Sequence, residues 1–129
     1  TCLVGSEMCI RDSAYGESGD ALHGKFMLCA MTAGAPEESY APDGLNHFSL
    51  NELLQPLEQT ARLCGMRYLP PFPLFGARTA LAEGRAVRHA GEWRLVLEAL
   101  RDDAFDLRAA MNLSRLYENL DALLGARND

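Results

Sequence analysis

Residues 25–46 read KFMLCAMTAGAPEESYAPDGLN, and this stretch decides the fold. Its first part, residues 25–31, is a continuous apolar run bounded by turn residues. A run of that length is typical of a buried strand in a parallel sheet rather than of a helix. Residues 32–46 then predict a long loop, and loops of this length are commonly functional or disordered. The stretch therefore predicts a buried parallel strand that leads into a loop of interest.

A helix is predicted directly after this loop. Ser49 and Glu52 have the S-x-x-E spacing of a capping box, ahead of an apolar periodic stretch. The helix should reach Leu63 or Cys64, where Gly65 is a natural terminator. Pro56 lies inside it and is expected to kink it. Six residues should share the apolar face: Leu50, Leu53, Leu54, Leu57, Ala61 and Cys64.

The remaining chain alternates in the same way. A second strand is predicted to start at Met66, and the prolines at 70, 71 and 73 exclude a central ladder beyond Leu69. Helices are predicted over residues 79–101, weakened by Gly84 and Gly91, and over residues 113–124. The stripe of the first comprises Leu81, Val87, Ala90, Trp93, Leu97 and Leu100. Alternating strands and helices predict an α/β fold, a parallel sheet flanked by helices, and two strands leave such a sheet incomplete.

The amino-acid composition limits the class of protein. The chain has 129 residues, 48% of them hydrophobic, and a formal net charge of −6. An acidic chain lacks the clustered Lys and Arg that nucleic acids and anionic membranes require. The longest apolar run, residues 26–31, is far too short to cross a bilayer. The four cysteines have no metal-ligand spacing, which predicts reduced thiols, a cytoplasmic protein and no metal site.

The first residues form a separate feature. Residues 3–12 read LVGSEMCIRD, which resembles the translation of a transposase adapter used to prepare DNA sequencing libraries. The segment also lacks a hydrophobic period, a helix cap and turn chemistry. We therefore expect residues 1–13 to be a non-native leader that packs poorly. Residues 14–129 are then expected to be the C-terminal part of a domain.

Several short motifs occur together in a particular order. They are A-Y-G at 14–16, L-x-G-K at 22–25, T-x-G-x-P-E at 32–37, Tyr40, G-x-N at 44–46, E-L-L-x-P-L-x-x-T-A at 52–61 and C-G-x-x-x-L-P-P-F at 64–72. In this order the chain resembles the NAD(P)H dehydrogenase (quinone) family of flavodoxin-like flavoproteins. It is most similar to the ancillary quinone reductases of glutathione-regulated potassium-efflux systems. The resemblance implies the C-terminal portion of a flavodoxin-like parallel sheet.

The resemblance assigns a cofactor role to the turn after the first strand. In the family, backbone amides of a T-T-G-G segment bond the pyrimidine end of the flavin, and that segment falls on Thr32, Ala33, Gly34 and Ala35. Ligands of open α/β sheets do bind beyond the strand carboxyl ends, and glycine lets backbone approach a flat ring. Ala33 and Ala35 depart from the family pattern by one methyl group each. A plain strand-ending turn is the alternative interpretation.

The resemblance also implies two catalytic candidates. Tyr40 occupies the place of a tyrosine beside flavin O2, where a phenol stabilises developing negative charge. The histidine that follows in relatives falls on Asn46, a cofactor-binding candidate, with His47 next to it. An exposed loop tyrosine and a solvated loop histidine are the alternatives for Tyr40 and His47. The two other histidines, His23 and His89, are expected on the surface.

Three further features are interpreted as structural. Residues 70–72, Pro-Pro-Phe, predict a rigid strand exit, which the resemblance places near the rim of the active site. Trp93, on a leucine stripe, is expected in the core. Glu37 and Glu38 lack an obvious partner and are expected to be solvated.

The resemblance finally implies a function. Family members are homodimers that use FMN, less often FAD, to pass two electrons from NAD(P)H to a quinone. Nothing in the sequence matches the family's phosphate-binding loop, so this chain as given is expected to bind FMN weakly or not at all and to lack activity. The alternative is a regulatory ancillary subunit of a potassium-efflux antiporter. The expected location is the cytoplasm, at the inner membrane if the antiporter is the partner.

Overall fold

The computed structural model of the chain describes residues 13–15 and 19–125, which we call the described residues. Of the expected leader, only Ser13 is among them; the rest of the leader, including Cys2 and Cys9, lies outside the described residues. The chain divides into two compact units. Unit 1 comprises the residues up to Met27 together with Leu53–Tyr68, and unit 2 comprises Leu28–Glu52 and the chain from Leu69 onward.

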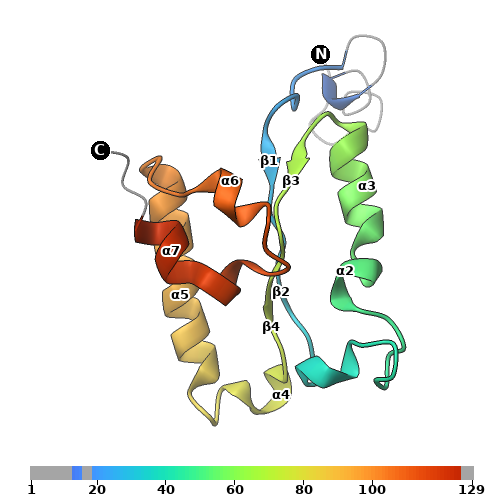
Figure 1. Cartoon of the computed structure of the whole chain (residues 1–129), viewed down its shortest axis with the longest axis vertical. Coiled ribbons are helices and arrows are strands. Elements are labelled where there is room, and N and C mark those ends of the chain that lie inside the picture. Colours follow the sequence, from blue (N-terminus) through green and yellow to red (C-terminus); the bar gives the residue numbers. More distant parts are fainter. Residues whose placement is uncertain (1–12, 16–18, 126–129) are drawn as a thin grey trace, which may run out of the picture. The chain divides into compact units, whose positions relative to one another are not determined.

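Unit 1 contains one parallel strand pair and a helix. Strand β1 (Phe26–Met27) pairs with β3 (Arg67–Tyr68), with Phe26 opposite Arg67 (Figure 1). Helix α3 (Gln55–Leu63) precedes β3 and is followed by Gly65, whose φ is +68°. A Cβ there would lie 2.6 Å from Nδ1 of His23, so glycine is required at this turn. The predicted terminator of the helix is confirmed.

The predicted capping box forms at the start of α2 (Leu50–Leu53). The backbone N–H of Ser49 donates to the Glu52 carboxylate at 2.7 Å, and the Glu52 N–H donates to Ser49 Oγ at 3.3 Å. The Ser49 hydroxyl also donates to the Glu52 carboxylate, at 2.6 Å, and this bond, together with the one from the Ser49 N–H, lowers the pKa of Glu52. Regular helix is interrupted at Leu54, because Pro56 has no N–H to donate and fits only the first turn of α3. The interruption shifts the apolar stripe, and Leu53 and Leu57 stay exposed.

Unit 2 contains the second parallel pair. Strand β2 (Ala30–Thr32) pairs with β4 (Phe72–Leu74), and Met31 lies opposite Pro73. The single buried strand predicted over residues 25–31 is therefore wrong: it is two short strands, and Ala30 and Thr32 are exposed. Among the described residues each strand has a ladder partner on one side only, so its other backbone edge is not paired with a strand.

The predicted exclusion of a central ladder beyond Leu69 is not contradicted, because within the described residues β4 is paired on one side only. The prolines do not end the pairing altogether, however. The ladder resumes beyond Leu69, where the Phe72 N–H donates to the Cys29 carbonyl at 2.8 Å. Pro73 sits within β4 because this strand pairs only with β2 in the part of the chain described, and edge strands tolerate a residue without an N–H. Residues 70–72 are thus not a strand exit, since Phe72 begins a strand and is fully buried.

Helices follow β4 in unit 2. They are α4 (Ala77–Ala80), α5 (Arg85–Arg101), α6 (Leu107–Ala110), the 3₁₀ turn η2 (Leu116–Asn119) and α7 (Leu120–Gly125). Gly84, with φ +70°, separates α4 from α5, as its position in the predicted helix suggested. The helix predicted over residues 113–124 begins later, and α6 was not predicted. The Asp106 side chain caps α6 by accepting from the Ala109 N–H at 2.8 Å.

The core of unit 2 gathers where α5 packs on β4 and α7 (Figure 1). Its buried members are Phe72, Val96, Phe105, Ala110, Leu116 and Leu123. Trp93 packs against this core, as expected. The predicted stripe of α5 is displaced, however, because Val87 and Leu97 are exposed while Val96 is fully buried. The face that contacts the core runs through His89, Trp93, Val96 and Leu100.

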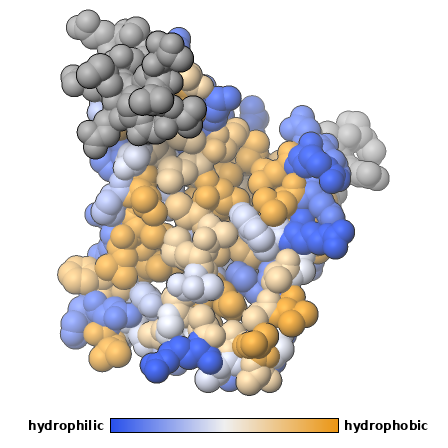
Figure 2. Space-filling model, turned by 180° about the vertical axis from the view of Figure 1, so that it is seen from behind, coloured by the Kyte–Doolittle hydropathy of each residue, from blue (hydrophilic) through white to orange (hydrophobic). Residues whose placement is uncertain are grey.

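Apolar side chains also remain on the surface. Orange residues are prominent on the face drawn in Figure 2, and the described exposed residues include Leu45, Phe48, Leu81 and Val87. Among the described helices, none has the length and apolar character needed to cross a membrane.

Candidate functional site

The loop that follows β2 is held against the turn that follows β4. The Ala33 N–H donates to the Leu74 carbonyl at 2.9 Å, which extends the ladder by one residue. In return, the Gly76 N–H donates to the Ala35 carbonyl at 2.9 Å and the Ala77 N–H donates to the Ala33 carbonyl at 3.0 Å. Three backbone hydrogen bonds therefore fix residues 33–35 at the carboxyl end of the parallel pair, where α/β proteins bind ligands.

Two amides of this loop stay available for a ligand. Within the described part of the chain, the N–H groups of Gly34 and Ala35 donate to no protein acceptor. Gly34 is exposed, and a Cβ built on it would approach only Cδ of Arg78, at 4.0 Å. Ala33 is buried and its N–H is used by the ladder. Of the four predicted cofactor-binding residues, Gly34 and Ala35 thus offer free donors, and Thr32 and Ala33 belong to the ladder.

Tyr40 closes the short 3₁₀ turn η1 (Glu37–Ser39). Its N–H donates to the Glu37 carbonyl at 2.9 Å, and its ring packs against that of Phe75, with 5.3 Å between centroids. Phe75 directly follows β4, so the tyrosine is anchored to the same strand end as the loop. The phenol hydroxyl forms no hydrogen bond with any described residue, which leaves it available to a ligand.

Asn46 and His47 end the same loop. The Asn46 N–H donates to the carbonyl of buried Ser39 at 2.9 Å, which places Asn46 next to the residue that precedes Tyr40. His47 is exposed and adopts a left-handed backbone with φ +59°. The structure thus brings Tyr40 and Asn46 to one compact turn, and a catalytic role of His47 stays a prediction.

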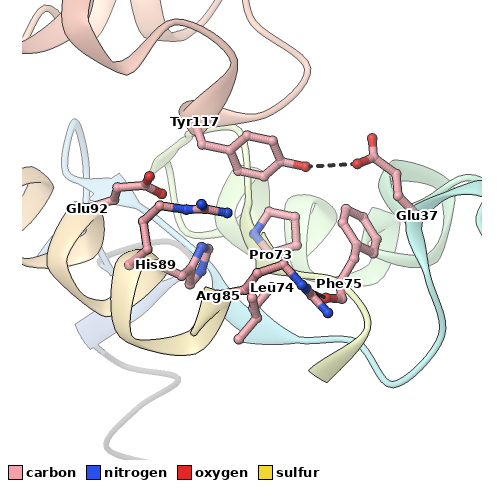
Figure 3. Close-up of a pocket in the computed structure, with 9 residues that line it drawn as sticks. Glu37, Pro73, Leu74, Phe75, Arg85, His89, Glu92 and Tyr117 are labelled. Carbon is pink, nitrogen blue, oxygen red and sulfur yellow. Dashed lines mark hydrogen bonds between the residues drawn. The ribbon is translucent and has the colours of Figure 1, made fainter. Parts of the chain in front are cut away.

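A cavity of about 320 Å³ lies beside β4 in unit 2 (Figure 3). Glu37 stands at its rim, where it pairs with the Arg115 guanidinium and accepts a long bond from the Tyr117 hydroxyl at 3.5 Å. Glu37 is exposed, as expected, but the expectation that it lacks a partner is wrong. Arg115 also lies over the Phe75 ring, 5.3 Å from its centroid. Sequence reasoning could not find these partners, because 78 residues separate Glu37 from Arg115.

His89, which also lines this cavity, departs from its expected surface position. Rather than lying on the surface, its imidazole is half-buried and stacks on Phe72, with 4.3 Å between ring centroids. Burial lowers the pKa of His89, and the negative charge of Glu92 opposes that shift without cancelling it. His23 is exposed, as expected.

We predict that acidification destabilises unit 2 through His89. Because its pKa is lowered in the folded state, the unfolded chain binds the extra proton first, and stability falls as the pH drops through 6.5, the ordinary imidazole value. Unfolding midpoints measured across this range should fall more steeply in the wild type than in His89→Phe, which keeps the ring stack. His47→Ala, at an exposed position, is the control, and an identical pH profile in all three proteins would contradict the prediction.

Metal chemistry has no support in the described residues. They contain no group of three or more His, Cys, Asp or Glu side chains placed to hold a metal ion. Cys29 and Cys64 are free thiols, and both are half-buried. Cys29 lies between β1 and β2.

Parallel strand pairs and flanking helices define an α/β protein, and the loop with free amides at the strand carboxyl ends is its candidate ligand site. A family model described as "Flavodoxin-like fold" matches residues 5–97. The chain belongs to this flavodoxin-like family, which confirms both the predicted fold class and the resemblance on which it rested.

Curated relatives are similar over part of their length. General stress protein 14 of Bacillus subtilis is 46% identical over 70 residues, covering 54% of this chain and 40% of the relative. The glutathione-regulated potassium-efflux system ancillary protein KefG of Cronobacter sakazakii is 41% identical over 68 residues, 53% and 37% of the two chains. The uncharacterized NAD(P)H oxidoreductase YdeQ of Bacillus subtilis is 42% identical over 82 residues, 59% and 42%.

A solved structure has the same arrangement. The general stress protein 14 of Treponema denticola, in complex with FMN, superposes with a TM-score of 0.59 and 38% identity. The match covers 67% of this chain and 49% of that one. The chain therefore spans half or less of the length of these relatives.

Proposed function

We propose that this chain supplies the flavin-binding edge of an FMN-dependent NAD(P)H:quinone oxidoreductase. The observation that carries the proposal is the pair of unused amides, Gly34 and Ala35, held in a rigid turn at the carboxyl end of a parallel strand pair. Free backbone donors at such an edge suit the acceptor atoms of the pyrimidine end of a flavin. The open space at Gly34 permits a planar ring to approach the backbone.

Each residue of the loop has a distinct part in this proposal. The amides of Gly34 and Ala35 donate to the flavin's carbonyl end, and the ladder bond of Ala33 keeps them in place. Tyr40, whose ring packs on Phe75, would stabilise negative charge at that end with its hydroxyl. Bound FMN would supply hydride chemistry, in which NAD(P)H provides two electrons and one proton as hydride and solvent provides the second proton that the quinone takes up. Asn46 orients the ring, and His47 exchanges protons with solvent.

The relatives support this choice of chemistry. One similar structure contains FMN, which favours FMN over FAD, and one similar protein is called an NAD(P)H oxidoreductase. This chain matches half or less of the length of each of these two proteins. The enzymatic activity is therefore proposed for the whole protein. We further propose that the active form is a homodimer in the cytoplasm, because the family resemblance implies pockets shared between two chains.

Titration with FMN tests the proposal. The protein expressed from its complete gene should quench the fluorescence of FMN and yield a visible absorbance spectrum of bound flavin after gel filtration. It should then oxidise NADH or NADPH when a naphthoquinone is added. Gly34→Pro, which removes one of the two free donors, should weaken FMN binding about tenfold, the value of one hydrogen bond of ordinary strength. Absence of flavin binding by the wild type would sink the proposal.

A second candidate function rests on the similarity to KefG. That protein is an ancillary protein of a glutathione-regulated potassium-efflux system, so this chain's alternative role is to dock on an antiporter at the inner membrane. Co-purification with the antiporter and a change in potassium efflux on deletion of the gene would support it. Unchanged efflux, together with quinone reduction in the purified protein, would favour the enzyme alone.

A further inference from the structure

Arg85, the first residue of α5, connects that helix to the turn after β4. Its Nη1 donates to the Phe75 carbonyl at 2.7 Å, and its Nη2 donates to the Gly76 carbonyl and to Thr79 Oγ1, both at 3.1 Å. Its Nε donates to the Glu83 carboxylate at 2.5 Å. Four hydrogen bonds thus engage a guanidinium that has five N–H groups. Figure 3 shows this side chain next to Phe75.

The turn that Arg85 contacts, residues 75–77, is also the turn that is hydrogen-bonded to the loop at residues 33–35. Gly76 has φ +60°, and its N–H donates to the Ala35 carbonyl, while the next N–H, of Ala77, donates to the Ala33 carbonyl. A Cβ at Gly76 would lie 3.1 Å from Nη2 of Arg85, so the guanidinium packs directly on the glycine backbone. Because both carbonyls of the turn accept from Arg85, the two N–H groups that point to the loop are held in one orientation.

We propose that Arg85 is a positioning residue that orders the free amides of Gly34 and Ala35 through the turn at residues 75–77. The inference rests on the proposed function, because the amides matter only if a ligand accepts from them. Arg85 contacts the turn and not the loop, so it acts through Gly76. It also ties that turn to α5, whose next turns pack on the core through His89 and Trp93.

The chemistry of the guanidinium explains why arginine is needed. Two carbonyls that face the same direction are bridged by a planar fork, whereas the ammonium of lysine is a single point with tetrahedral donors. Arg85→Lys keeps the charge and the pair with Glu83 but can bond only one carbonyl well. It separates an effect of geometry from an effect of charge.

Hydrogen exchange of the apo protein tests the clamp without any cofactor. In Arg85→Ala the amides of Gly76 and Ala77 should exchange about tenfold faster, as expected for loss of charge-assisted hydrogen bonds to their turn. Exchange in the core of α5 should not change. Arg85→Lys should fall between Arg85→Ala and the wild type. Arg94→Ala, on the same helix but paired with Glu98 at the protein surface, is the matched control and should behave as the wild type.

FMN affinity is the second measurement. Arg85→Ala should raise the Kd for FMN about tenfold, with Arg85→Lys again intermediate, because less ordered donors bind their acceptor with a larger entropic cost. Wild-type exchange and wild-type Kd in Arg85→Ala would overturn the inference. Faster exchange at Gly76 and Ala77 in a protein whose wild type binds no FMN would keep the clamp and refute the cofactor function. If Arg85→Ala does not fold, the same comparison is made with Arg85→Lys.

Discussion

Replacement of Phe72 by alanine should be the most destabilising single change in unit 2, by about 3–5 kcal/mol of unfolding free energy. Phe72 is fully buried and its ring contacts three other aromatic rings, those of His89, Trp93 and Tyr117. Its loss would remove apolar contacts and leave a cavity that the two-stranded ladder and α5 cannot close without moving. Trp93 is the single tryptophan, and its ring centroid lies 5.2 Å from that of Phe72. Its fluorescence therefore reports urea unfolding at this location.

Leu81→Ala is the matched control for this substitution. Leu81 is also apolar and lies in the same unit, but it is 76% exposed. Its replacement should change the unfolding free energy by no more than about 0.5 kcal/mol. If the urea midpoint of Phe72→Ala lay within the error of the Leu81→Ala midpoint, the core described for unit 2 would be wrong.

Gly44→Ala should also destabilise the protein, with a loss of about 1–3 kcal/mol that is concentrated in the loop of Tyr40. A Cβ at Gly44 would press on the Glu38 carbonyl oxygen and lie 2.8 Å from the carbonyl carbon of Ser39. Both obstacles are backbone atoms, which cannot rotate away as a flexible side chain can. The turn η1 would have to shift, and with it the packing of Tyr40 on Phe75. Thermal unfolding and FMN titration measure the two consequences.

Gly91→Ala, at another glycine of unit 2, should raise the free energy of unfolding rather than lower it. Nothing lies within 4 Å of a Cβ built on Gly91, and this glycine is inside α5. Alanine there should stabilise the protein by roughly 0.5–1 kcal/mol, because it removes backbone freedom from the unfolded chain. Equal and neutral effects at Gly44 and Gly91 would contradict the tight packing of the loop.

The alternation of elements and several of their ends could be predicted from the sequence because their causes are local. The capping box joins Ser49 to a residue three positions away. Gly65 ends α3 and Gly84 precedes α5, each through its own left-handed backbone conformation. The apolar run and the helices between strands predicted parallel pairing, which both ladders show. For the site, the turn after β2 was predicted from its motif, and its residues do lie at a strand carboxyl end.

Which side chains of a helix are buried, by contrast, depended on the segments that pack against that helix. The apolar period of α5 suggested a stripe through Val87 and Leu97, yet Val96 is the residue buried, because β4 and α7 contact the adjacent face. In the same way, Pro73 lies within a ladder although proline lacks an N–H to donate, because β4 is paired on one side only among the described residues.

The sequence by itself thus determined the alternation of strands and helices, several helix ends and the family, since propensity, capping and turn chemistry act over a few residues. Only the tertiary structure decided which amides of the loop are free, that Arg85 holds the turn opposite them, and that Glu37 pairs with Arg115. The physical reason is that these contacts join segments far apart along the chain. Their formation depends on how the whole unit packs, which no local pattern encodes.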